Sequence, residues 1–256
     1  MFLAIDIGNT NISFGLFDNN ILKNSFNFQY KKHMPKEYYE NIFKILLKQN
    51  ISECAISSVV DEITNTVSKA VECTFKIKPF IIQSDTTKFN LKIKAEHPEK
   101  IGMDRITNAC AVKNLYSSKP AIVVDIGTAT TFDIINKKGD FIGGLIIPGI
   151  GTQLKSLFDN TSKLPNIDAK EIETVSKTIN TDTKKAILSG VVKGHAHAIE
   201  GLIKDCKKEL RGKPIIIATG GNAKLISKYT KENLFDEVNS NLTLEGLCVI
   251  NNLNKN

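Results

Sequence analysis

The stretch FLAIDIGNTN at residues 2–11 recurs as IVVDIGTAT at residues 122–130. In both copies an apolar run ends in Asp-Ile-Gly, passes hydroxyl or amide side chains, and continues into a second apolar run. Short β-branched runs joined by a glycine-containing segment are typical of β-hairpins. A turn and a third strand-like run follow each copy, and the copies lie nearly half the chain apart. The repeat therefore predicts two similar halves, each opening with a β-meander.

Helix-like and strand-like segments alternate after each meander. The spacing of apolar residues predicts a buried strand over Ile215–Thr219 and helices over Tyr38–Lys48, Asp104–Tyr116, Thr183–Leu210, Asn222–Tyr229 and Leu244–Leu253. A chain of 256 residues suits two domains of ordinary size. We predict an α/β fold of two similar domains with mixed sheets flanked by helices, covering residues 1–117 and 118–256.

The composition limits the class of protein. Hydrophobic residues make up 41% of the chain and charged residues 24%, which allows a full core and excludes wholesale disorder. The net charge is +7, but the lysines are scattered, Trp is absent, and the only arginines are Arg105 and Arg211. Nucleic-acid surfaces cluster Lys and Arg and interleave aromatics, so we expect no nucleic-acid partner.

The location of the protein is also predicted from what the sequence lacks. Its apolar runs are too short to span a bilayer, and its first residues lack the basic charges that open a signal peptide. We therefore expect a cytoplasmic protein without a membrane partner. Five scattered cysteines without a Cys-x-x-Cys pair argue against a disulfide framework and a thiolate zinc site.

The two glycine hairpins carry the chemistry. Glycine at a tight bend permits close approach of a ligand, and successive backbone N–H groups there form a concavity that binds anions. Asp6 and Asp125, at the strand ends, offer hard oxygen ligands to a metal ion. One Asp-x-Gly alone would indicate only a turn. Two matched copies predict that the hairpins bind a polyphosphate from two sides, with a divalent ion between the hairpins.

A third glycine-rich element follows the buried strand that ends at Thr219. Gly220 and Gly221 would let an adenine ring or its ribose lie against the backbone, and Asn222 could cap the next helix. An ordinary strand-to-helix turn is the alternative. A further corner at Gly143-Gly144 and Pro148-Gly149 could be purely structural.

These motifs together resemble known families. Asp6-x-Gly8-Asn9-Thr10, Asp125-x-Gly127-Thr128 and Thr219-Gly220-Gly221 resemble the phosphate-1, phosphate-2 and adenosine motifs of the acetate and sugar kinase, heat-shock cognate and actin superfamily. With Gly102-Met103-Asp104-Arg105 and Gly143-Gly144 in order, nearly the whole chain resembles type III pantothenate kinase. The resemblance implies two ribonuclease H-like (actin-like ATPase) domains. It also implies ATP-dependent phosphorylation of pantothenate to 4′-phosphopantothenate, the first step of coenzyme A biosynthesis.

The resemblance also implies roles for individual residues. ATP would contact Asp6, Ile7, Gly8, Asn9, Thr10, Asn11, Ile12, Ser13, Thr128, Gly220 and Gly221. Magnesium would lie near Asp6, and a monovalent cation, K⁺ or NH₄⁺, near Asp125. Pantothenate would contact Gly102, Met103, Asp104, Arg105 and Thr183. The family is homodimeric, so we expect a homodimer.

Within the substrate motif, Asp104 is the candidate general base, because a carboxylate beside the acceptor hydroxyl can take its proton. Its alternative role is to cap the predicted helix. Arg105 could hold the pantothenate carboxylate through its planar fork, or form only a surface ion pair.

Three positions leave alternatives open. Thr181 competes with Thr183, and Asp182 stands where the family commonly has Asn. Ala95 occupies a position where many members have Tyr, so that contact is missing or supplied elsewhere, for example by Phe89. His195 and His197 lie two residues apart and point in different directions on a helix, which favours packing or surface roles over a shared metal ion.

Two other functions remain open at this stage. Another small-molecule kinase or a phosphatase of the same superfamily would share the hairpins and differ only around residues 102–105 and Thr183. A transcription accessory factor is the second alternative, and the pI of about 9.0 would suit it.

Overall fold

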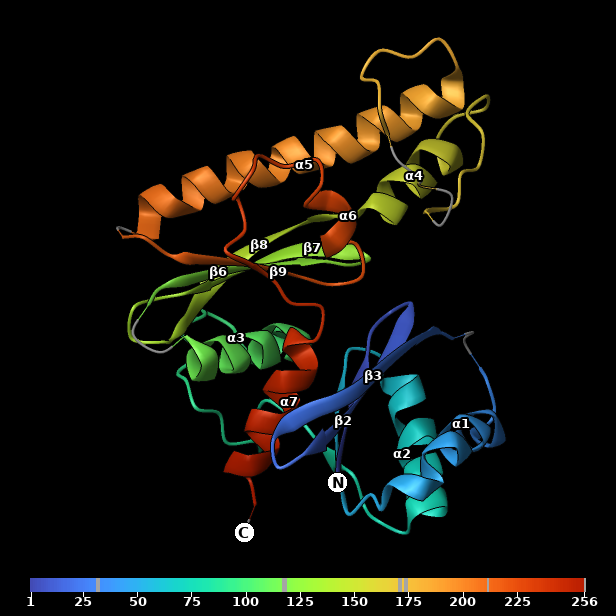
Figure 1. Cartoon of the computed structure of the whole chain (residues 1–256), viewed down its shortest axis with the longest axis vertical. Helices are drawn as coiled ribbons and strands as arrows, with labels where there is room; N and C mark the ends of the chain where they lie inside the picture. Colours follow the sequence, from blue (N-terminus) through green and yellow to red (C-terminus); the bar gives the residue numbers. More distant parts are fainter. Residues whose placement is uncertain (31–32, 117–118, 170–171, 173–174, 211, 256) are drawn as a thin grey trace. The chain divides into compact units, whose positions relative to one another are not determined.

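The computed structural model describes residues 1–30, 33–116, 119–169, 172, 175–210 and 212–255. The chain divides into two compact units, each containing a five-stranded sheet (Figure 1). Unit 1 comprises Met1–Ser118, Gly139–Phe141 and Asn241–Asn256, and unit 2 comprises Lys119–Lys138 and Ile142–Ser240. The C-terminal helix thus groups with unit 1, although it follows unit 2 in the sequence.

The sheet of unit 1 has the order β3-β2-β1-β4-β5. The predicted meander is confirmed as β1 (Phe2–Ile7), β2 (Asn11–Asp18) and β3 (Ile21–Gln29), paired antiparallel. Strands β4 (Glu53–Ser58) and β5 (Phe80–Ile81) extend the sheet in parallel. The sheet is therefore mixed, as predicted.

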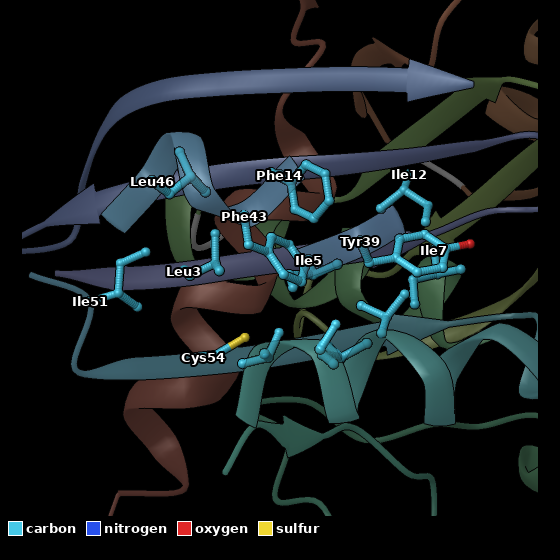
Figure 2. Packing of buried hydrophobic residues seen from close by; sticks show 14 of the residues in the cluster. Leu3, Ile5, Ile7, Ile12, Phe14, Tyr39, Phe43, Leu46, Ile51 and Cys54 are labelled. Atoms are coloured by element: carbon cyan, nitrogen blue, oxygen red, sulfur yellow. The ribbon is translucent and has the colours of Figure 1, made fainter. Parts of the chain in front are cut away.

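Helices cover the sheet of unit 1. They are α1 (Lys36–Phe43), α2 (Asp61–Phe75), α3 (Met103–Leu115) and α7 (Leu242–Leu253), with 3₁₀ turns η1 (Lys44–Gln49) and η2 (Pro98–Lys100). Leu3, Ile5 and Ile7 of β1 pack with Tyr39 and Phe43 of α1 in the core (Figure 2). The predicted helix over Tyr38–Lys48 is α-helical only to Phe43 and then tightens into η1.

Two helical features of unit 1 go beyond the prediction. Helix α2 was not predicted, although Ile63, Val67 and Val71 recur every four residues and are all buried. Helices α3 and α7 approach closely, because a Cβ on Gly246 would collide with the carbonyl of Thr107.

The sheet of unit 2 has the order β10-β9-β6-β7-β8. Its strands are β6 (Ala121–Ile126), β7 (Ala129–Ile135), β8 (Phe141–Pro148), β9 (Ile215–Thr219) and β10 (Glu237–Val238). Its helices are α4 (Ile150–Asp159), α5 (Thr183–Leu210) and α6 (Ala223–Ile226), the last shorter than predicted. Buried residues of α4 and α5 form one apolar cluster with β6 and β7. No helix in the described ranges is long and apolar enough to cross a membrane.

Candidate active site

The first hairpin, residues 7–12, joins β1 to β2. The side chains of Ile7 and Ile12 point into the core and are fully buried (Figure 2). Between them, the Gly8 N–H donates to the Asn11 carbonyl at 3.0 Å, and Asn9 is exposed. Within the predicted phosphate-binding segment, Ile7 and Ile12 can therefore offer a ligand only their backbone.

Tyr30 braces this hairpin. Its buried phenol donates to the carbonyls of Gly8 at 2.9 Å and Asn9 at 3.2 Å. Burial raises the pKa of Tyr30 above its usual value of 10.0, so the phenol keeps the proton that it donates. The motif gave no sign of this contact, because Tyr30 lies beyond the end of β3.

Asp6 ends β1 among oxygen-bearing side chains. It pairs with Ser13 of β2 and Ser57 of β4, and residues in register on neighbouring strands share one face of the sheet. The Ser57 hydroxyl is buried, with no hydrogen-bond partner in the described part of the chain. Carboxylate and hydroxyl oxygens suit a hard cation, so this donor set fits magnesium shared with phosphates.

The predicted substrate motif forms the start of α3. Gly102 precedes the helix, and Asp104 and Arg105 lie in its first turn. The Arg105 N–H donates to Asp104 Oδ1 at 2.8 Å and to the Gly102 carbonyl at 3.1 Å, so Asp104 contributes to the hydrogen bonding of that turn. A Cβ on Gly102 would lie 2.5 Å from Asp104 Oδ1. Glycine at position 102 is therefore what lets the carboxylate rest against the chain there.

The electrostatics of Asp104 suit a proton acceptor. Burial raises its pKa above the usual 3.8, and the N–H and guanidinium of Arg105 oppose that shift. A carboxylate with a raised pKa accepts a proton more readily than a solvated one.

The substrate motif and the first hairpin meet at one edge of the unit 1 sheet. The Val59 N–H, just beyond β4, donates to the Ile7 carbonyl at 3.1 Å. A Cβ on Gly102 would lie 3.7 Å from Cγ1 of the same valine. Val59 thus links the hairpin to the beginning of α3.

Arg105 is held by an aromatic ring. Its guanidinium lies 5.5 Å from the ring centroid of Phe141, which is buried. Phe141 is fixed in unit 1 by the segment 92–94, because its N–H donates to the Lys92 carbonyl and its carbonyl accepts from the Lys94 N–H. A cation–π contact of this kind orients the guanidinium.

The second hairpin, residues 126–130, joins β6 to β7 in unit 2. The Gly127 N–H donates to the Ala129 carbonyl at 3.0 Å, and Thr128 is exposed. The third glycine element lies directly beside it. Gly220 has a φ of +88°, a Cβ there would collide with Asp125 Oδ1, and the Asn222 N–H donates to the Ile126 carbonyl at 3.0 Å.

The corner before α4 also packs on the second hairpin. The Gly149 N–H and the Thr152 hydroxyl both donate to the Thr128 carbonyl, at 3.0 and 2.7 Å. A Cβ on Gly149 would collide with the carbonyls of Gly127 and Thr128. This corner thus lies against the turn and fixes its backbone.

The remaining predicted residues are spread over unit 2. Thr183 begins α5 and is exposed, and Asp182 caps that helix by accepting the Lys185 N–H at 2.9 Å. Asp and Asn are equally good at such a position, which accounts for Asp where the family commonly has Asn. His195 is buried, whereas His197 is exposed.

Two further features of the described residues bear on other sites: a cavity in unit 1 and the surroundings of Asp125. Among the residues that the structure describes, no three His, Cys, Asp or Glu side chains are grouped as metal ligands. A cavity of about 420 Å³ in unit 1 is lined by residues of β2, α3 and α7, and includes none of the predicted site residues. Asp125 pairs with Thr131 and Thr219, again an oxygen-rich setting that fits a hard monovalent cation.

Comparison with known proteins decides the family. A sequence model described as type III pantothenate kinase matches residues 2–205. The chain belongs to the type III pantothenate kinase family. It is therefore a phosphotransferase of the actin-like ATPase superfamily, and the two mixed sheets flanked by helices are that fold.

Solved structures with the same fold are distant in sequence. A Baf family transcriptional activator from Campylobacter jejuni is 23% identical, with a TM-score of 0.57 over 99% of this chain and 100% of that one. Component A of (R)-2-hydroxyglutaryl-CoA dehydratase from Acidaminococcus fermentans is 12% identical, with a TM-score of 0.54 over 97% and 95%. The ethanolamine utilization protein EutJ from Carboxydothermus hydrogenoformans is 15% identical, with a TM-score of 0.53 over 97% and 89%. At these identities the likeness concerns the fold alone.

Proposed function

We propose that the chain phosphorylates the primary hydroxyl of pantothenate with ATP, giving 4′-phosphopantothenate and ADP. Family membership supports the substrate. The observation that carries the mechanism is Asp104, whose half-buried carboxylate lies at the sheet edge that also holds the first hairpin. The two hairpins bind the ATP phosphates, and Gly220 and Gly221 lie along the adenosine.

Asp104 acts as the general base. It accepts the hydroxyl proton while the alcohol oxygen forms its bond to the γ-phosphorus and the bond from that phosphorus to the β-γ bridging oxygen breaks. ADP leaves with that oxygen, and the proton passes from Asp104 to solvent. A well-placed base contributes about 10²–10⁴-fold in rate.

Arg105 binds the pantothenate carboxylate, with its guanidinium held over Phe141. Thr183 lies twelve residues before His195 on α5, about 18 Å along the helix. Thr183 is exposed, which leaves it accessible to pantothenate, and family membership supports a homodimer.

Two cations complete the proposal. Magnesium held by Asp6 and the ATP phosphates would neutralise charge on the transferring group. Potassium or ammonium at Asp125 would do the same beside the second hairpin. The chain itself orients the phosphates through the N–H groups of the two turns.

The test is ADP release from purified protein given ATP, Mg²⁺, K⁺ and pantothenate. Asp104→Asn should lower kcat by about 10²-fold or more. Its thermal stability should stay the same or rise, because the buried charge is removed. The matched control is Asp61→Asn, an exposed aspartate in the first turn of α2, which should keep full activity.

The outcomes separate the alternatives. Turnover with another alcohol and not with pantothenate would assign a different kinase of the superfamily. Equal activity of Asp104→Asn and the native chain would remove the general base from the proposal. Omitting K⁺ and NH₄⁺ should lower the rate if Asp125 binds a monovalent cation.

A further inference from the structure

His195 connects the second hairpin to the start of α4. Its Nε2 lies 2.9 Å from the Thr130 hydroxyl, and its Nδ1 lies 2.9 Å from Gln153 Nε2. Thr130 is the last residue of the hairpin, in register with Ile126, and Gln153 lies in the first turns of α4. One buried imidazole, contributed by α5, therefore touches both elements that enclose Thr128.

The hydrogen bonds fix the form of the imidazole. Gln153 Nε2 also donates to the Pro148 carbonyl at 2.9 Å. A carbonyl can only accept, so the nitrogen of the Gln153 amide must face it. The second hydrogen of that nitrogen then points to His195 Nδ1, which must be an unprotonated acceptor. The proton of neutral His195 consequently sits on Nε2 and is donated to Thr130.

Among the residues that the structure describes, no neighbouring charge assists protonation of His195. Thr130, Phe132 and Ile134 form the face of β7 toward α5, and Asp133 lies on the opposite face. On α4 the charged residues Lys155 and Asp159 are exposed and pair with each other at 2.9 Å. Within α5 the residues one turn away are apolar: Val191, Val192 and Ile199. Burial alone lowers the pKa of His195 below its usual 6.5.

We propose that His195 is a positioning residue for nucleotide binding: as the neutral Nε2–H form it ties Thr130 to Gln153 and holds the second hairpin in the shape that binds phosphate. The proposal rests on the proposed function of that hairpin. His195 touches no phosphate itself. It acts through Thr130 on one side, and through Gln153 and the Pro148–Gly149 corner on the other.

The first test compares variants by MgATP affinity, measured by calorimetry, together with KM for ATP and kcat. His195→Gln can place its amide near Thr130, but it has no atom at the position of Nδ1, so the Gln153 amide loses its acceptor there. We expect the Kd and KM for ATP to rise about tenfold, the worth of one hydrogen bond at most, with kcat changed less. The control is His197→Ala, an exposed histidine of the same helix, which should match the native chain.

A loss of packing alone must give a different result. Ile199→Val removes one buried methyl group from the same face of α5, so it lowers thermal stability without touching the hydrogen bonds. Its KM for ATP should stay native. If Ile199→Val and His195→Gln raise the KM equally for the same loss of stability, His195 is only a core residue and the proposal is wrong.

The second test needs no variant of His195. Nitrogen NMR of histidine-labelled native protein should show His195 as the neutral Nε2–H form at neutral pH, with His197, which is exposed, as the reference signal. An Nδ1–H form, or a doubly protonated His195 at neutral pH, would overturn the proposal. If the native protein does not bind MgATP at all, the proposed function is wrong instead. The NMR result would still show whether His195 joins Thr130 to Gln153 in the neutral Nε2–H form.

Discussion

The two hairpins begin with the same Asp-Ile-Gly but are held in different ways. The first is longer by one residue, because Ile7 pairs with Ile12 whereas Ile126 pairs with Thr130. The first turn is held mainly by Tyr30, whose phenol donates to the carbonyls of Gly8 and Asn9, while the Val59 N–H donates to Ile7. The second turn is held by the Pro148–Gly149 corner, which packs on its backbone, and by the hydrogen bonds of His195 to Thr130 and Gln153. The repeat thus specifies a bend after an acidic strand end, and the parts of the chain outside the repeat supply its support.

The largest difference in stability between changes at the two hairpins is expected at Gly149. A Cβ there collides with two carbonyls of the second hairpin, and the first hairpin has no such neighbour among the described residues. Gly149→Ala should cost about 1–3 kcal/mol in the free energy of unfolding, as overpacking does. Thermal denaturation checks this, with Gly194→Ala on α5, where a Cβ meets nothing within 4 Å, as the control. If Gly149→Ala had the stability of the native chain, the backbone around Pro148–Gly149 would be able to shift and accommodate the added Cβ.

The glycines inside the turns should behave in the opposite way. A Cβ on Gly8 would lie 3.4 Å from its nearest neighbour, and one on Gly127 would lie 3.5 Å away, both ordinary contacts. The fold therefore does not require glycine at either position. If phosphates approach these turns, Gly8→Ala and Gly127→Ala should keep native stability and weaken MgATP binding about tenfold. Native affinity in one variant would show that only the other hairpin binds the nucleotide.

The sequence predicted the local elements of each hairpin but not the contacts that support them. Strand runs and the β-meanders were predictable, because local pattern determines them. The placement of Asp125 beside Gly220 was not predicted, because it depends on the parallel pairing of β6 with β9. The start of α3 at Met103 was predicted within one residue. Tyr30, Gln153 and His195 were not recognised as supports. Their contacts join positions far apart in the chain, and such pairs leave no periodic signal in a single sequence. The grouping of α7 with unit 1 has the same cause.

Tyr30→Phe tests the lighter support of the first hairpin. It removes one hydroxyl and keeps the buried ring, so about 1 kcal/mol of hydrogen bonding to the Gly8 and Asn9 carbonyls is lost. We expect the KM for ATP to rise about fivefold with kcat nearly unchanged, a smaller effect than that of either turn glycine. Steady-state kinetics measure it, and Tyr38→Phe, at a tyrosine whose side chain lies against the same core, is the control. A larger effect than that of Gly8→Ala would reverse the order argued here.

Acidity should affect only one of the two supports. The pKa of Tyr30 is raised by burial, so its phenol does not titrate between about pH 5.5 and 8. The folded-state pKa of His195 is lowered, so below 6.5 the unfolded chain binds more protons than the folded one. The free energy of unfolding should therefore fall as the pH drops through 6.5 and be fully restored above it. MgATP affinity should weaken at still lower pH, where His195 becomes protonated in the folded chain.

The protonation of ATP itself also changes over that range, so the informative quantity is a ratio between proteins at each pH. Native chain, His197→Ala and Tyr30→Phe should share one pH dependence of the Kd for MgATP, because all three retain His195. His195→Gln should show a flatter one. A proton on Nδ1 would face the hydrogens of the Gln153 amide, so the hydrogen bond between Gln153 and His195 would lose its acceptor. No change in the first hairpin can compensate for that loss. If the Kd for MgATP had the same pH dependence in all four proteins, protonation of His195 would not be its cause. The supports of the two hairpins would then not differ in their response to acid.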